Sequence, residues 1–146
     1  RFIVVVLKVN NDLERIGDLS ENLTARAVYL AEREPMPEPM AIINGMFVTI
    51  RSMLKDSLDS LVKLDVDLAR KVIEQDDGVD QINRQMYDDF RQMMARDASM
   101  IEQATSWLSC SRYLERIADL ATNISEDVVF MVEGEVVRHQ TQETSL

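Results

Sequence analysis

The fold is decided by the stretch Tyr113-Leu-Glu-Arg-Ile-Ala-Asp-Leu-Ala-Thr-Asn-Ile-Ser-Glu-Asp127, because a copy of it stands near the start of the chain. The copy reads Asp12-Leu-Glu-Arg-Ile-Gly-Asp-Leu-Ser-Glu-Asn-Leu23 and lies in register with it at an offset of 101 residues. The identical pairs are Leu13/Leu114, Glu14/Glu115, Arg15/Arg116, Ile16/Ile117, Asp18/Asp119, Leu19/Leu120 and Asn22/Asn123. Identity at apolar and charged positions alike indicates an internal repeat, and a repeat constrains the architecture of the whole chain.

Composition indicates a compact helical protein with an acidic surface. The chain has 146 residues, of which 46% are apolar, with only four Gly and three Pro, and this length suits one domain with a sizeable core. A formal net charge of -10 argues against nucleic acid and anionic membrane surfaces, which both select clustered Lys and Arg. No apolar stretch approaches the ~18 residues of a transmembrane helix. The single Cys110 cannot form an intrachain disulfide.

Apolar residues recur at helical spacing in four segments, which predicts an all-α bundle of about four long antiparallel helices. The second helix is expected over residues 40–73, with a local break within residues 63–67. The third is expected to run from an N-cap at Asp76 or Asp77 to residue 96, and the fourth over residues 100–133. The first helix is expected over residues 2–33, and its packing stripe comprises Val9, Leu13, Ile16, Leu23, Ala27 and Leu30.

Three alternating prolines divide the chain, because proline cannot donate a backbone hydrogen bond and pushes the preceding residue out of the helical region. Residues 1–34 are predicted to be the last helix of a first repeat, and residues 35–39 a proline-rich linker. Residues 40–139 are predicted to form a complete three-helix second repeat, followed by a frayed tail over residues 140–146. Two upstream helices of the first repeat are therefore expected to be missing. The chain begins with Arg1, not Met, and we interpret it as a fragment or a processed product.

Three acidic pairs stand at i,i+4 spacing, namely Glu14 with Asp18, Asp76 with Asp80, and Glu115 with Asp119. This spacing places both carboxylates on one helix face, about 6 Å apart at Cβ, and costs an isolated helix roughly 0.2–0.5 kcal/mol. A shared cation would offset that cost, and oxygen ligands without Cys or His favour Mg, Mn, Ca or iron over structural zinc. Acidic pairs are also common on solvated faces, so spacing alone leaves a metal-free acidic surface as an alternative.

Larger motifs add to these pairs. The chain carries the signature Leu-Glu-Arg-Ile-x-Asp-x-x-x-Asn-Ile, an Asp-x-x-x-Asp pair upstream of it, and the ending Val-Glu-Gly-Glu-Val-Val-Arg-His139. In these motifs it resembles the PhoU family. The resemblance implies two three-helix repeats and acidic motifs that bind metal ions on the bundle surface, with multinuclear iron clusters in some members. It implies iron, manganese or magnesium as the cofactor and no organic group, and the ligands would be Glu14, Asp18, Asp76, Asp80, Glu115 and Asp119.

The same resemblance implies a function. It indicates a non-enzymatic regulator that limits phosphate uptake and controls phosphate-starvation signalling. The protein would be a helical adaptor that contacts the ATPase of a phosphate ABC transporter on one side and a sensor histidine kinase on the other. The adaptor would act in the cytoplasm. A homodimer is expected, because the first helix needs a neighbour for its apolar stripe. Since each site of the family draws ligands from more than one helix of a repeat, Glu14 and Asp18 are expected to lack partners, and only the second site to be complete.

Other functions and other side chains carry weaker signals. A carboxylate-bridged metalloenzyme would need Glu-x-x-His pairs facing the core, and the only histidine, His139, lies outside every motif. A metal-free helical scaffold is a further alternative. Arg15 and Arg116 would balance the charge of the acidic faces or hold a phosphate. The methionines near the third helix are expected in the core or in an adaptable contact surface, and they are Met86, Met93, Met94 and Met100.

Overall fold

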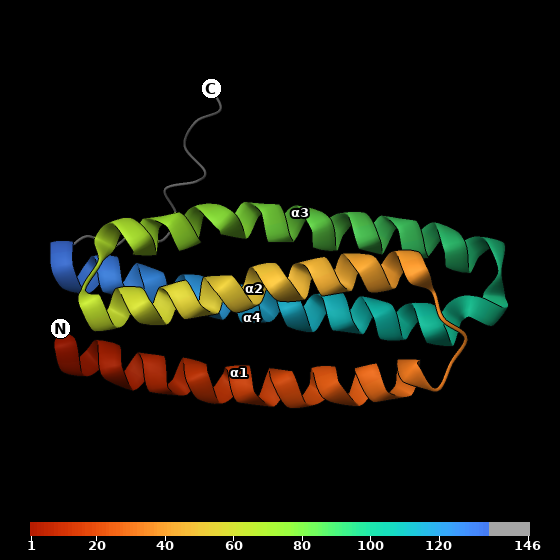
Figure 1. The fold of residues 1–146 in the computed structure, drawn as a ribbon, viewed down its shortest axis with the longest axis horizontal. Helices are drawn as coiled ribbons and strands as arrows, with labels where there is room; N and C mark the ends of the chain where they lie inside the picture. The colour runs from red at the N-terminus through yellow and green to blue at the C-terminus, as the bar shows by residue number, and fades with distance from the viewer. Residues whose placement is uncertain (135–146) are drawn as a thin grey trace, which may run out of the picture.

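Four long helices follow one another in a computed structural model that describes residues 1–134. They are α1 (Phe2–Ala31), α2 (Pro37–Lys63), α3 (Val66–Arg96) and α4 (Ile101–Glu133), with a short 3-10 helix η1 (Ala98–Met100) before α4. Consecutive helices run antiparallel (Figure 1). The described residues contain no strand, and the all-α prediction is confirmed. The predicted frayed tail and His139 lie outside the described residues.

The break between α2 and α3 falls within the predicted interval, and it is a full helix boundary. Lys63 ends α2, and Leu64 adopts the left-handed conformation with φ of 54°. The Asp65 carboxylate accepts a 3.0 Å hydrogen bond from the backbone N–H of Leu68, so Asp65 is the N-cap of α3. The prediction that the second helix continues to residue 73 was therefore wrong.

The predicted N-cap at Asp76 or Asp77 was also wrong, because α3 runs through this segment without interruption. Gly78 lies inside the helix, where glycine costs about 1 kcal/mol relative to alanine. Val72 and Val79 on either side are 0% and 2% exposed. Packing of this apolar face against the bundle outweighs the local preference of the Asp-Asp-Gly sequence for a helix start.

The proline-rich connection lies three residues earlier in the chain than the sequence predicts. Pro37 and Pro39 belong to the first turn of α2, which begins before the expected start at Met40. The first N–H groups of a helix have no intrahelical acceptor, so proline is tolerated there. The first helix ends at Ala31, not at residue 33, and the connection covers residues 32–36.

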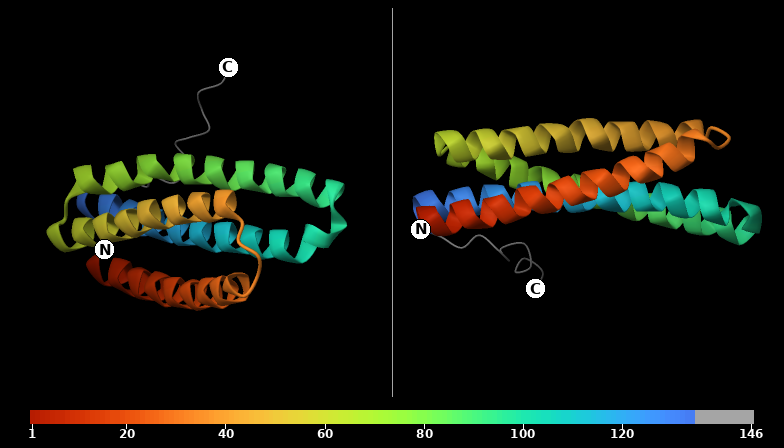
Figure 2. Two further views of the ribbon diagram at one scale, coloured as in Figure 1. Left: turned by 45° about the vertical axis from the view of Figure 1, so that its right-hand side comes forward. Right: turned by 90° about the horizontal axis from the view of Figure 1, so that it is seen from below.

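The long helices form a three-helix bundle with one additional helix beside it. Helices α2, α3 and α4 pack on one another, whereas α1 packs on α4 alone. The views of Figure 2 show α1 lying along one flank of the bundle. Because α4 contacts all three other helices, sixteen of its residues are buried, compared with five in α1.

The two copies of the repeat differ in which residues are covered. Ile16 of α1 and Ile117 of α4 are both buried, at 7% and 6% exposure. A stripe of buried residues on α4 has a stripe of exposed counterparts on α1. The buried positions are Ala104, Trp107, Ser111, Leu114, Ala118, Ala121, Ser125 and Val128, and the exposed counterparts are Ile3, Val6, Asn10, Leu13, Gly17, Ser20, Thr24 and Ala27.

This difference corrects the predicted packing stripe of the first helix. Val9 and Ile16 are buried as predicted, but Leu13 is 41% exposed and Ala27 is exposed. Val5, which the stripe did not include, is 1% exposed. The division into a first-repeat helix and a complete second repeat stays a prediction, and an uncovered stripe on α1 is what that division implies.

An ion pair fixes α1 against α4. The Lys8 ammonium contacts the carboxylate of Asp127, whose side chain is only 5% exposed, whereas that of Lys8 is 41% exposed.

Lys8→Met should lower the free energy of unfolding by about 1–3 kcal/mol, because it removes a donor from a buried carboxylate. Lys55→Met is the matched control, since the pair of Lys55 with Asp59 is on the surface, and it should leave urea denaturation almost unchanged. Equal effects of the two substitutions would contradict the structural role of Lys8.

Candidate metal centre

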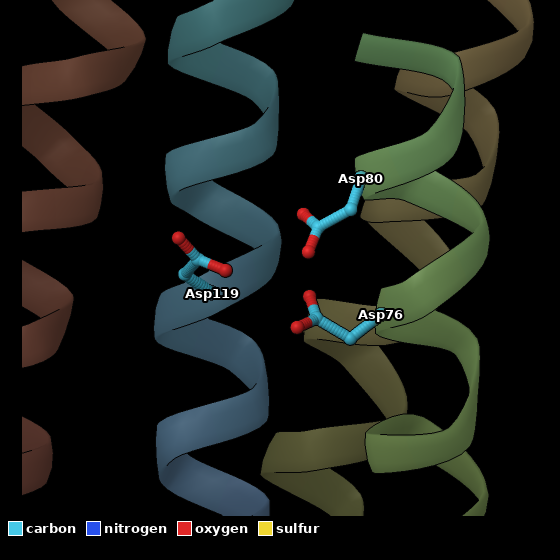
Figure 3. A group of neighbouring side chains, drawn as sticks. All are labelled: Asp76, Asp80 and Asp119. Carbon is cyan, nitrogen blue, oxygen red and sulfur yellow. The ribbon is translucent and has the colours of Figure 1, made fainter. Parts of the chain in front are cut away.

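Three aspartates from two neighbouring helices, α3 and α4, converge on one another. Asp76 and Asp80 lie one turn apart on α3, and Asp119 projects toward them from α4 (Figure 3). One carboxylate oxygen from each residue lies within 4.8 Å of the other two. All three side chains are half-buried. The i,i+4 spacing on α3 and the packing of α3 on α4 therefore produce one group of oxygen atoms from residues distant in the sequence.

Glu115 extends this group by one turn of α4. Its carboxyl lies near enough to Asp119, Asp80 and Asp76 for their charges to act on it, but the oxygens that lie within 4.8 Å of one another are those of the three aspartates. Burial raises the pKa of Glu115, and the charges of Asp80 and Asp76 act in the same direction. The structure thus places four of the six predicted ligands near one another, whereas periodicity alone left open whether the two pairs lie at one height. Their role as metal ligands stays a prediction.

Burial, and secondly the neighbouring carboxyls, raise the pKa values of Asp119 and Asp76 toward neutral pH. Burial raises the pKa of Asp119 to about 7, and the adjacent carboxyls of Glu115 and Asp80 add to the rise. Burial likewise raises the pKa of Asp76 to about 6, with further contributions from Asp119 and Asp80. The Thr122 hydroxyl beside Asp76 opposes that rise. The metal-free group therefore carries protons in the physiological range.

Two oxygen atoms of the group lack hydrogen-bond partners. Asp76 Oδ1 and Asp80 Oδ1 are buried and accept no hydrogen bond from the described residues. Buried polar atoms without a partner are uncommon, and an ion is one way to satisfy them. An all-oxygen donor set of this kind fits a hard cation such as Mg²⁺, Mn²⁺ or iron. The residues present therefore fit the metal that the sequence predicts, with Asp76, Asp80, Asp119 and Glu115 as the donors.

The group opens onto a groove between α1 and the bundle. The groove has a volume of about 750 Å³ and is lined by Asp76 and Asp119 on one side and by Arg15 and Asp18 on the other. Arg116 also lines it and lowers the pKa of Asp119, so this arginine balances part of the acidic charge. An ion bound by the carboxylates would be accessible from this groove.

The structure does not bring Glu14 and Asp18 into the carboxylate group. Both side chains are exposed, and Asp18 lines the far side of the groove while Glu14 does not line it. Within residues 1–134 the group of Asp76, Asp80 and Asp119 is the one cluster of three potential metal ligands. Helix α1 packs on α4 alone, and no second cluster of three potential ligands forms around Glu14 and Asp18 in the part of the chain that the structure describes.

Sequence reasoning missed Thr122 as a neighbour of the group. Its hydroxyl is buried and lies beside Asp76. A signal for it existed, because Thr122 follows Asp119 by three residues and so shares its helix face.

No helix among the described residues is long and apolar enough to cross a membrane.

The sequence of this chain matches a known protein family and several of its members. The PhoU domain family matches residues 43–128, which is more than half of the chain. The phosphate-specific transport system accessory protein PhoU homolog of Aquifex aeolicus is 39% identical over 140 residues, covering 96% of this chain and 63% of the relative. The phosphate-specific transport system accessory protein PhoU of Escherichia coli K12 is 30% identical over 139 residues, covering 95% of this chain and 57% of the relative.

Solved structures agree with the sequence comparison. The crystal structure of PhoU from Pseudomonas aeruginosa superposes with a TM-score of 0.88 at 31% identity, covering 92% of this chain and 65% of that one. The structure of the phosphate transport system regulatory protein PhoU from Streptococcus pneumoniae gives a TM-score of 0.78 at 27% identity, covering 94% and 64%. The chain spans about three fifths of the length of the relatives it matches. On the evidence of the repeat, the helical bundle and these matches, the chain belongs to the PhoU domain family.

Proposed function

We propose that this chain is a non-enzymatic regulator of phosphate uptake and of phosphate-starvation signalling. The observation that carries the proposal is the match, over nearly the whole chain, to relatives named as accessory proteins of the phosphate-specific transport system. The fold supports it, because the chain superposes on the phosphate transport system regulatory protein PhoU from Streptococcus pneumoniae. A helical bundle of this kind offers long surfaces for other proteins.

The carboxylate group is the proposed metal centre of the regulator. Asp76, Asp80 and Asp119, with Glu115, would hold a hard divalent cation or a multinuclear centre of iron, manganese or magnesium. When bound, the metal supplies positive charge that cancels carboxylate repulsion. The protein residues then tie α3 to α4, because the ligands come from both helices. Glu14 and Asp18 are proposed as ligands of a first site that α1 alone does not complete.

The proposed partners are a phosphate ABC transporter, contacted at its ATPase, and a sensor histidine kinase, both in the cytoplasm. The family resemblance suggests these partners, and the formal charge of -10 supports contacts to basic surfaces of other proteins. We also propose a homodimer. Its support is the uncovered stripe on α1, where Ile3, Val6 and Leu13 are 73%, 44% and 41% exposed, since apolar patches of this kind mark interaction sites.

A reporter of phosphate-starvation genes tests the proposed function. In a bacterial host that lacks its own PhoU, the chain should restore repression in phosphate-rich medium. The double substitution Asp80→Asn with Asp119→Asn should abolish repression if metal is required. The matched control is Asp67→Asn with Glu74→Gln, which removes two exposed acidic charges from α3 and should repress normally. If the unmodified chain leaves expression of the phosphate-starvation reporter undiminished in phosphate-rich medium, the regulatory role is contradicted.

A further inference from the structure

A hollow lined by methionine lies at the opposite end of α3 from its N-cap. Met86 and Met93 of α3 and Met100 of η1 line it, together with Phe90 of α3 and Ile42 of α2, and its volume is about 560 Å³. Met86 and Phe90 form a buried floor, at 2% and 3% exposure. The other three are half-buried. No lining residue belongs to α1 or to the carboxylate group, so the hollow is separate from the proposed metal centre.

The rim of this hollow is acidic. Glu38 from the first turn of α2, Asp89 from α3 and Asp97 at the C-terminal end of α3 all line it and are exposed. Arg96 is the one basic residue among the lining residues. Three carboxylates against one guanidinium give the rim a net negative charge, and α2, α3 and their connection to α4 each contribute to it.

The methionine-lined floor and the acidic rim together indicate the kind of peptide that would bind in the hollow. Methionine side chains are flexible and polarisable, so a methionine-lined hollow adapts to different apolar side chains. An apolar anchor surrounded by acidic residues complements a helix that presents one large apolar side chain flanked by Lys or Arg. We propose that this hollow is the docking site for a basic amphipathic helix of a partner protein.

Charge disfavours two other occupants of the hollow. A second copy of this chain carries a formal charge of -10, so its surface opposes an acidic rim, and the homodimer proposed above uses the exposed stripe on α1 instead. An anionic lipid surface is repelled for the same reason. A partner with clustered Lys or Arg around an apolar anchor meets both the floor and the rim.

Titration with a model peptide tests the proposal. The probe is an amphipathic Leu/Lys helix of about 18 residues with a single Trp at the centre of its apolar face, and its partner probe replaces every Lys with Glu. The Lys peptide should bind saturably, and the Glu peptide should not. In ¹³C-methyl NMR, the Met86, Met93 and Met100 signals should shift on binding. Met53, which is fully buried and does not line the hollow, should not shift.

Charge reversal at the rim separates this site from general attraction to an acidic protein. Glu38→Lys with Asp89→Lys should weaken binding of the Lys peptide about tenfold or more, since like charges then face each other. Glu21→Lys with Glu32→Lys makes the same change in net charge at two exposed positions, one on α1 and one directly after it, and it should leave the affinity within about twofold of the unmodified chain. Asp97 is left unchanged, because its carboxylate accepts hydrogen bonds from Ser99 that shape the connection to α4.

The titration is carried out in chelator and repeated with metal. Equal affinity in both conditions is expected, because the hollow and the carboxylate group share no residue. Three results would each overturn the docking site: equal binding of the Glu peptide, equal weakening by the two double substitutions, or methionine shifts confined to residues outside the hollow.

Discussion

Adding Mn²⁺ or Mg²⁺ at one hundred times its dissociation constant should raise the free energy of unfolding of the metal-free protein by about 2.7 kcal/mol. The folded chain places oxygens of Asp76, Asp80 and Asp119 within 4.8 Å of one another. The unfolded chain separates the α3 ligands from the α4 ligand, so it binds the ion weakly. Urea denaturation with and without metal measures the gain, because the transition midpoint moves with stability.

Two double substitutions of equal charge make this result specific. Asp80→Asn with Asp119→Asn removes carboxylates from the group and should abolish the stabilisation by metal. Glu14→Gln with Asp18→Asn removes two exposed carboxylates from α1 and should leave it intact. If metal still stabilises the variant Asp80→Asn with Asp119→Asn, or no longer stabilises the variant Glu14→Gln with Asp18→Asn, the metal binds somewhere else.

In chelator, the protein should become more stable as the pH falls from about 8 to about 5.5. The folded state raises the pKa of Asp119 to about 7 and that of Asp76 to about 6. A carboxyl with a raised pKa binds more protons in the folded chain than in the unfolded chain, so stability is lost as pH rises through these values. Both groups are half-exposed and solvent screens them, so we expect a total change of about 2 kcal/mol.

Urea denaturation at several pH values measures this dependence. Asp119→Asn should flatten it, because the amide cannot titrate and does not repel its neighbours. Saturating metal should remove the gain at low pH, since the ion requires ionised carboxylates and protons compete with it. Carboxyls with lowered pKa values, such as Asp59 and Asp97, lose their contribution only below this range. Stability that rises with pH in chelator between about 5.5 and 8 would contradict protonation of the group.

The repeat made the central helix and half of the candidate site predictable. Leu114, Ile117 and Ile124 lie on the apolar face that periodicity identifies, and all three are buried. Glu115 and Asp119 follow from their spacing on one helix. Periodicity along a single helix fixes which side chains share a face, so features of this kind can be predicted from the sequence.

The relation between helices could not be predicted in the same way. Whether Asp76 and Asp80 lie level with Asp119 depends on where α3 begins, and the Asp-Asp-Gly sequence suggested a start in the wrong place. The actual start at Asp65 is set by the left-handed Leu64 and a side-chain cap. Only the packed structure shows that α3 passes α4 with these carboxylates at the same height (Figure 3).

The packing of α1 was mispredicted for a related reason. The sequence pattern assumes that every apolar stripe is covered, yet Leu13 is 41% exposed while its counterpart Leu114 is 1% exposed. Leu13 and Leu114 occupy equivalent positions of the repeat, and their exposure differs because the bundle covers Leu114 but no described helix covers Leu13. Glu14 and Asp18 do not form a cluster of three ligands with other described residues, although their sequence repeats that of Glu115 and Asp119.

Electron paramagnetic resonance of Mn²⁺, titrated into chelator-treated protein, tests the metal centre most directly, because bound and free ions give different signals. The unmodified chain and the variant Glu14→Gln with Asp18→Asn should each bind at least one ion per chain saturably, and Asp80→Asn with Asp119→Asn should bind none. Absence of saturable binding by the unmodified chain, or equal binding by the variant that lacks the Asp80 and Asp119 carboxylates, would contradict a metal centre formed by α3 and α4.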